Sequence, residues 1–75
     1  MKNKVKELII SLGCGVTELL IDFELGEYTF NSIEYHEETD KVILHIFEDD
    51  QDYYFDFEDL DSYNQKYILE LLQGI

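Results

Sequence analysis

The fold is decided by residues 28–58, which read YTFNSIEYHEETDKVILHIFEDDQDYYFDFE. Apolar and polar residues alternate through this stretch with the period of two that is typical of half-buried β-strands. We predict three strands, at residues 28–36, 41–48 and 52–58. The segment Glu37–Asp40 separates the first two strands, and Asp50-Gln51 precedes the third. No proline interrupts any of them, because the sequence contains none.

The register of these strands can be tested by asking whether two hairpins turn the same side chains toward one face. The predicted cross-strand pairs are His36–Lys41, Tyr35–Val42 and Ile33–Leu44 in one hairpin, then Asp49–Asp52, Phe47–Tyr54, Ile46–Phe55, His45–Asp56, Leu44–Phe57 and Ile43–Glu58 in the next. Both hairpins place Leu44 on the inward face, as a half-buried sheet requires.

Upstream of this stretch, residues 19–25 also alternate, and a turn at Gly26-Glu27 would join them to the strand at 28–36. A helical turn competes with this interpretation, since Val16, Leu19, Leu20 and Phe23 recur at helical spacing. Residues 16–25 are therefore strand or helix. In the strand interpretation Phe30 points inward with Phe23, and Ile33 can follow only if a β-bulge lies near Asn31-Ser32.

Helical periodicity appears at both ends of the chain. Val5, Leu8, Ile9 and Leu12 predict a helix over residues 3–12. A second helix is predicted over residues 61–72, with Asp61 as a suitable N-cap. The predicted fold class is α+β: an N-terminal helix, a three- to four-stranded antiparallel meander and a C-terminal helix, with both helices on one face of the sheet. Residues 1–75 form a single domain in this interpretation.

The charge of the chain is strongly negative and unevenly distributed. Eighteen acidic residues face five lysines, which gives a formal net charge of −13. Residues 22–61 hold fifteen of the acids and only Lys41, a net charge of −14. This balance argues against nucleic acid or an anionic membrane as a direct partner.

Compartment and stabilisation can also be inferred from the sequence. The single cysteine excludes an internal disulfide framework. No apolar run approaches the ~18 residues of a membrane span. Glu7 interrupts the apolar stretch that a signal peptide would need at the amino terminus. We therefore expect a cytoplasmic protein.

Catalytic and metal-binding chemistry find little support in the sequence. No pair of carboxylates is singled out for acid–base work, and no base lies near Cys14 in the sequence. The oxygen cluster at residues 48–52 lacks the glycine and ligand spacing of a calcium loop. In the predicted register His36 and His45 lie about 13 Å apart, at ~3.3 Å per residue. We predict no enzymatic activity, no cofactor and no metal.

The outward face of the predicted sheet combines apolar side chains with acids. Its residues are Leu20, Asp22, Glu24, Glu34, Ile43, His45, Phe47, Tyr54, Asp56 and Glu58. Apolar strips of this kind mark interaction surfaces. A plainer interpretation is that the loop Cys14–Thr17, or another copy of the chain, covers the strip.

We infer a non-enzymatic interaction module whose protein partner offers a basic surface. The residues expected at the contact are Phe47, Glu48, Asp49, Asp50, Asp52, Tyr54, Asp56 and Glu58. A narrower hypothesis is an inhibitor of phage or mobile-element type whose carboxylates imitate nucleic-acid phosphates. The alternative is a small structural or homodimeric domain that buries Ile43, Phe47 and Tyr54, with acidity serving solubility alone.

Overall fold

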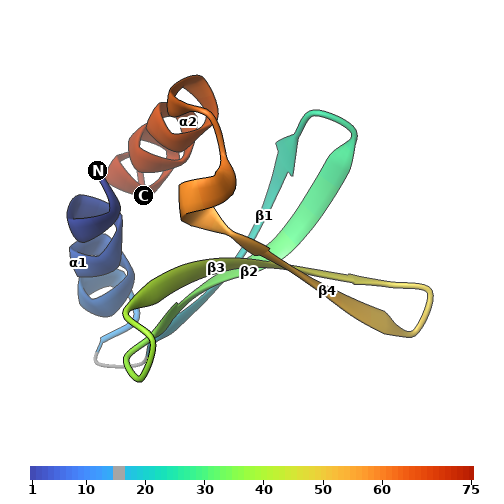
Figure 1. Cartoon of the computed structure of the whole chain (residues 1–75). Helices are drawn as coiled ribbons and strands as arrows, with labels where there is room; N and C mark the ends of the chain where they lie inside the picture. Colours follow the sequence, from blue (N-terminus) through green and yellow to red (C-terminus); the bar gives the residue numbers. More distant parts are fainter. Residues whose placement is uncertain (15–16) are drawn as a thin grey trace.

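The computed structural model describes residues 1–14 and 17–75 and confirms the α+β fold (Figure 1). Its elements are α1 (Lys2–Leu12), β1 (Glu18–Leu25), β2 (Tyr28–His36), β3 (Lys41–Glu48), β4 (Gln51–Asp56), a 3₁₀ turn η1 (Phe57–Asp59) and α2 (Ser62–Gln73). Four antiparallel strands form one sheet in the order β1-β2-β3-β4. Within the described part of the chain, no helix has the length and apolarity needed to span a membrane.

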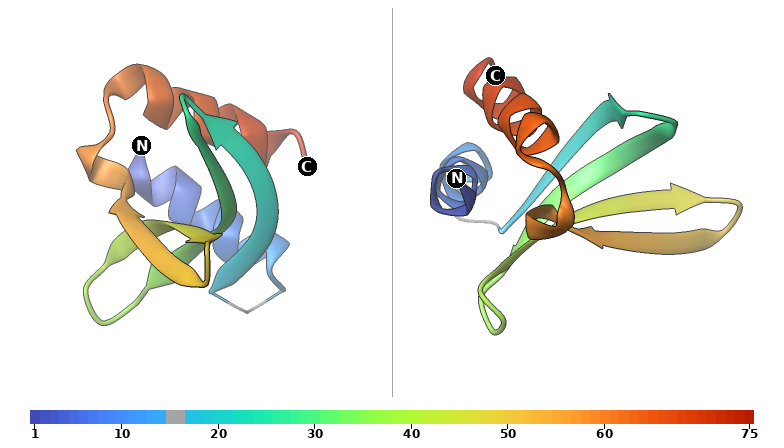
Figure 2. Two further views of the ribbon diagram at one scale, coloured as in Figure 1. Left: turned by 90° about the vertical axis from the view of Figure 1, so that its right-hand side faces the viewer. Right: turned by 45° about the horizontal axis from the view of Figure 1, so that its top comes forward.

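The central hairpin β2–β3 has the predicted register. His36 pairs with Lys41, and Ile33 pairs with Leu44. The pairing ends at Ser32 and His45, although both strands continue beyond this point. The hairpins β1–β2 and β3–β4 consequently diverge, as Figures 1 and 2 show.

The predicted register of β3–β4 is wrong by two residues. Leu44 pairs with Phe55, His45 with Tyr54, and Phe47 with Asp52, in place of Phe57, Asp56 and Tyr54 respectively. The turn lies at Asp49 and Asp50, one position earlier than expected, and both residues have positive φ, 53° and 61°. Two positive φ values belong to the two-residue type I′ turn, whose twist matches that of the flanking strands.

A register shift of two residues leaves every strand side chain on the same face of the sheet. The strand residues predicted to point inward therefore still do so. The chain instead leaves the sheet earlier than predicted, because β4 ends at Asp56 and Phe57 begins η1. The Asp56 side chain accepts a hydrogen bond from the Glu58 backbone N–H at 2.9 Å and so caps this turn. Phe57 is fully buried.

The segment Glu18–Leu25 is a β-strand. The strand interpretation is therefore correct for the described residues of this region. Val16 lies outside them. The expected bulge is confirmed: the register shifts between Leu20 and Phe23, and Phe23 pairs with Phe30. Gly26 has φ +65° at the first position of the turn, a conformation that favours glycine.

Both helices contribute to the single core. Asp61 is the N-cap of α2, its carboxylate accepting from the Asn64 N–H at 2.8 Å. Figure 2 shows α1 and α2 next to each other. The buried apolar residues are Val5, Ile9, Phe23, Leu25, Phe30, Ile33, Tyr35, Val42, Leu44, Ile46, Phe57, Ile68 and Leu72. One face of the sheet therefore packs on the helices, and the opposite face is available for a site.

Candidate functional site

The face of the sheet turned away from the helices, here called the open face, is crossed by one continuous row of side chains. Leu20 of β1 pairs with Ser32 of β2, Ser32 with His45 of β3, and His45 with Tyr54 of β4. Because directly paired residues lie on the same side of a sheet, these four side chains form a line across all four strands. We call it the central row.

Contacts along the central row hold its aromatic members in place. The Ser32 Oγ lies 3.2 Å from His45 Nδ1, and Ser32 is buried. The His45 ring stacks on Tyr54 with centroids 4.8 Å apart and planes 18° apart. His45 Nε2 also lies 2.6 Å from Asp52 Oδ1. The expected pair of His45 with Asp56 is absent, because the register shift brings Asp52 to the imidazole instead.

Large apolar surface is exposed on this face. The exposed fractions of Leu20, Tyr54 and Phe47 are 79%, 59% and 55%. Ile43 is half-buried. Whether the loop Cys14–Thr17 covers the strip is a question that falls partly outside the described residues, since it concerns residues 15 and 16.

Carboxylates surround the central row. Glu18 and Glu34 are direct partners across β1 and β2. Partial desolvation raises the pKa of the Tyr54 phenol above its ordinary value of 10.0, and the charges of Asp52, Glu34 and Glu18 raise it further. Three carboxylates from three strands thus act on one aromatic side chain.

The structure divides the predicted contact residues among several places. Phe47, Asp52 and Tyr54 lie together on the open face. Asp49 and Asp50 form the β3–β4 turn, at the tip of that hairpin. Glu48, at the end of β3, precedes them.

Two predicted residues are engaged elsewhere. The Asp56 carboxylate lies on the open face, but it forms an ion pair with the Lys41 ammonium at 3.3 Å. Glu58 belongs to η1 and its carboxylate lies 3.7 Å from Lys2 of α1, on the helix side of the molecule. The open face and the β3–β4 turn therefore form one candidate surface without Glu58.

The contribution of Glu18 and Glu34 to this surface does not follow from the sequence pattern alone. Glu18 was outside the predicted strand, and only the pairing of β1 with β2 brings it beside Glu34. The sequence predicts Glu34 on the outward face but not among the contact residues. The alternation of residues 19–25 can be extended by one polar residue to Glu18, and this extension is the signal that would have placed Glu18 in the strand.

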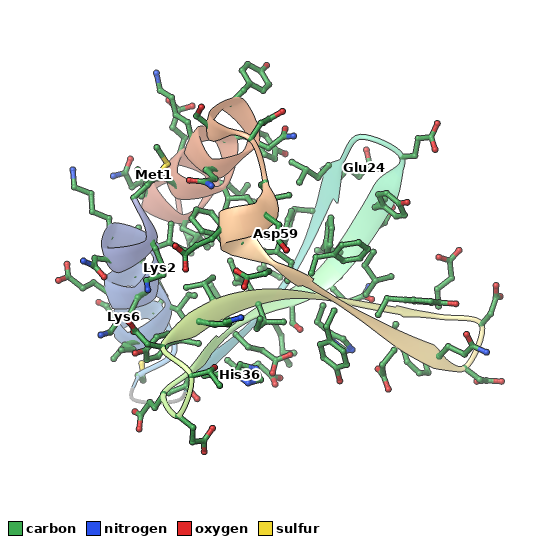
Figure 3. The ribbon with its side chains drawn as sticks, viewed as in Figure 1. Met1, Lys2, Lys6, Glu24, His36 and Asp59 are labelled. Carbon is green, nitrogen blue, oxygen red and sulfur yellow. The ribbon has the colours of Figure 1, made fainter. Side chains whose placement is uncertain are left out.

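Positive charge is concentrated away from the open face. Lys2 and Lys6 both lie within 4.0 Å of Asp40, in the β2–β3 turn. Figure 3 labels these two lysines on α1. In the described part of the chain, Lys41 is the one lysine that forms an ion pair on the sheet. The carboxylates Glu34 and Asp52 have histidine partners, at 3.3 Å and 2.6 Å.

The described residues offer no candidate metal centre. Across residues 1–14 and 17–75, no group of three or more His, Cys, Asp or Glu side chains could hold a metal ion. Cys14 is exposed and has a positive φ of 53°. The predicted absence of enzymatic activity stays a prediction.

Comparisons with known proteins identify no relative of this chain, so its function has to be inferred from the surface described above. No family model, no curated protein and no solved structure matches this chain.

Proposed function

We propose that this chain is a non-enzymatic interaction module that binds a basic surface of a partner protein through its open face and its β3–β4 turn. The observation that carries the proposal is the exposed apolar set Leu20, Phe47 and Tyr54, surrounded by carboxylates from three strands. Within the described residues, no lysine lies within ion-pair distance of Glu18, Glu34 or Asp52.

The two components of this surface have different physical roles. A cluster of carboxylates without lysine partners attracts a basic partner and raises the rate of encounter. Exposed apolar and aromatic side chains then supply contact area that excludes water, and binding energy is usually concentrated at such anchors. Phe47 and Tyr54 are the anchors in this proposal. We place the interaction in the cytoplasm.

The narrower version is an inhibitor that occupies a nucleic-acid-binding groove, as the phage and mobile-element type of acidic protein does. The side-by-side pairing of Glu18 with Glu34, on a hydrogen-bonded sheet, supports a regular array of negative charge. If this version holds, added DNA or RNA displaces the chain from its partner. A partner that binds equally well with and without nucleic acid leaves only the broader version.

The test is capture of the partner from a lysate of the source organism on immobilised protein, eluted in salt steps. The open-face variant Glu18→Gln/Glu34→Gln/Asp52→Asn removes three charges. The control variant Glu7→Gln/Glu70→Gln removes charge from the exposed side of the two helices. We expect the open-face variant to bind about tenfold more weakly or worse, and the control to bind as the unaltered protein does.

Two results would overturn the proposal. One is equal retention of the partner by both variants, which would mean that the open-face charges are not used. The other is a partner that resists high salt, because salt screens exposed charge interactions but does not weaken apolar burial.

A homodimer is the second candidate function, and the exposure of Leu20, Phe47 and Tyr54 on one face is the observation that favours it. Such a dimer would bring two chains of charge −13 together, so it should form more readily as salt rises. Sedimentation equilibrium at low and high salt distinguishes the two. A monomer at all accessible concentrations excludes the dimer.

A further inference from the structure

On the helix side of the sheet, a cleft lies between the two diverging hairpins. A regular β2–β3 ladder would continue past Ser32–His45 to pair Asn31 with Ile46, but the pairing stops. The Asn31 Oδ1 instead accepts a hydrogen bond from the Phe47 backbone N–H at 2.6 Å. Figure 2 shows the tips of the two hairpins apart from each other.

Two hollows occupy this region and share the side chains of Tyr28 and Phe55. The larger, about 420 Å³, has Leu25, Glu27, Tyr28, Phe30, Phe55 and Leu60 in its lining. The smaller, about 320 Å³, is lined by Tyr28, Ile46, Glu48, Asp49, Tyr53 and Phe55. Both volumes fall in the ~300–1,000 Å³ range of small-molecule pockets, so each has room for a large apolar side chain.

The shared wall is a packed aromatic cluster. Tyr28 and Phe55 have ring centroids 5.5 Å apart, and Phe30 meets Phe55 edge-on at 5.7 Å. Phe30 is buried, which anchors the cluster in the core. Tyr28 and Tyr53 nevertheless remain 53% and 45% exposed. Preformed aromatic surface of this kind binds with little loss of side-chain entropy.

The charge at the rim restricts what can bind. Glu27 contributes to the larger hollow, and Glu48 and Asp49 contribute to the smaller. No lysine is among the described residues that line either one. A second copy of this chain would bring its own net charge of −13 to the same place. Charge complementarity therefore favours an occupant that carries lysine or arginine beside its apolar residues.

We propose that this cleft receives the apolar side chains of a lysine- or arginine-rich segment of a partner protein. The two hollows take two apolar anchors, and Glu27, Glu48 and Asp49 contact the flanking cations. Tyr54 and the rest of the central row lie on the opposite face of the sheet, so this site is separate from the open face and shares only the start of the β3–β4 turn, at Glu48 and Asp49, with the surface proposed above. It stands whether or not the open face binds a partner.

The probe for this site is a short synthetic lysine-rich peptide with two leucines on one helical face, and its matched control has serines at both leucine positions. Titration into ¹⁵N-labelled protein at moderate salt should shift the amide resonances of Leu25, Tyr28, Phe55 and Leu60. The serine peptide should produce only weak shifts, because it has the charge without the anchors.

Variants test the assignment of the cleft. Tyr28→Ser and Tyr53→Ser each remove an exposed aromatic ring from the lining of the cleft. We expect each variant to bind the leucine peptide with about tenfold lower affinity. Tyr63→Ser is the matched control, since Tyr63 is 82% exposed on α2 and lines neither hollow. It should leave affinity unchanged. Far-UV circular dichroism checks that every variant is folded.

Three outcomes contradict the proposal: equal affinity for the leucine and serine peptides, shifts confined to the open face around Leu20 and Tyr54, or self-association that is lost in Tyr28→Ser. Failure of the open-face variant in the capture experiment does not bear on this site, because the two tests alter opposite faces of the sheet.

Discussion

Two turns of the same sheet carry aspartates in the same backbone conformation but in opposite electrostatic surroundings. Asp40, in the β2–β3 turn, has φ 54°, and Asp50, in the β3–β4 turn, has φ 61°. The Asp40 carboxylate accepts from the Tyr35 hydroxyl at 2.7 Å and pairs with Lys2 at 3.1 Å. Within the described residues, Asp50 has no ion-pair partner.

The difference separates two uses of acidity in one small domain. Asp40 links the sheet to α1, because Lys2 also donates to the Asp40 backbone carbonyl at 3.0 Å. Lys6 reinforces this link by lying 4.9 Å from the centre of the Tyr35 ring. Asp40 therefore stabilises the fold. The acids of the β3–β4 turn only add repulsion, so their contribution is to be sought in binding.

The largest expected effect on stability comes from removing the hydroxyl that holds Asp40. Tyr35 is buried, and its hydroxyl donates to a charged acceptor. We expect Tyr35→Phe to lower the free energy of unfolding by about 1 kcal/mol, in line with the net value of a hydrogen bond. Urea denaturation measures it. No loss of stability would mean that the β2–β3 turn is not tied to the fold as described.

The pH dependence of Asp40 comes next. The Tyr35 hydrogen bond, followed by Lys2, lowers the pKa of Asp40 below its ordinary value of 3.8. A lowered folded-state pKa contributes stability above the ordinary value and loses it as the pH falls through the lowered one. Asp40→Asn should therefore be less stable than the unaltered protein near neutral pH, and the difference should shrink below about pH 4. A difference that persists unchanged in acid would contradict the ion-pair explanation.

Asp50→Asn, the matched substitution in the β3–β4 turn, should change the free energy of unfolding in the opposite direction. Asn adopts positive φ readily and is favoured in type I′ turns. Asp50→Asn also removes one charge from a crowded acidic turn. We expect unfolding free energy to rise by a few tenths of a kcal/mol, within the ±0.5 kcal/mol typical of surface changes. A loss comparable to that of Asp40→Asn would remove the contrast between the turns.

The smallest effect concerns the central row. Asp52 is among the carboxylates that raise the pKa of Tyr54, so Asp52→Asn should lower that pKa toward 10.0. Titration of the tyrosine ring resonances measures it, with Tyr54→Phe assigning the signal. Asp59→Asn serves as a control, because Asp59 belongs to η1 and is not among the causes of the shift. An unchanged Tyr54 titration would show that the open-face charges do not act on the aromatic row.

The sequence could predict much of this fold, and the β3–β4 error has a specific physical origin. Alternation tells which face a side chain occupies, but a two-residue slip leaves every face unchanged. Only the backbone preference of the turn distinguishes the two registers, and two consecutive aspartates with positive φ are less obvious than an Asn-Gly pair. The consequence was a wrong partner for His45, which meets Asp52 and Tyr54.

The cleft between the hairpins could not be predicted from the sequence, for a different reason. Periodicity describes each strand separately, whereas the cleft depends on where β2 and β3 stop pairing. The bulge that shifts the register after Leu20 was foreseen from Phe30 and Ile33, which lie three apart and both point inward. How far the hairpins then diverge depends on packing among distant aromatic residues, which no local pattern encodes.

The central claim is that the carboxylates of the open face and the β3–β4 turn are the ones a basic partner covers. Carbodiimide labelling of carboxylates, with and without the captured partner and read out by mass spectrometry, tests it residue by residue. The account predicts protection of Glu18, Glu34, Asp50 and Asp52. Protection confined to the helix-side acids Glu7 and Glu70, or no protection of any carboxylate in a complex that has formed, would contradict it.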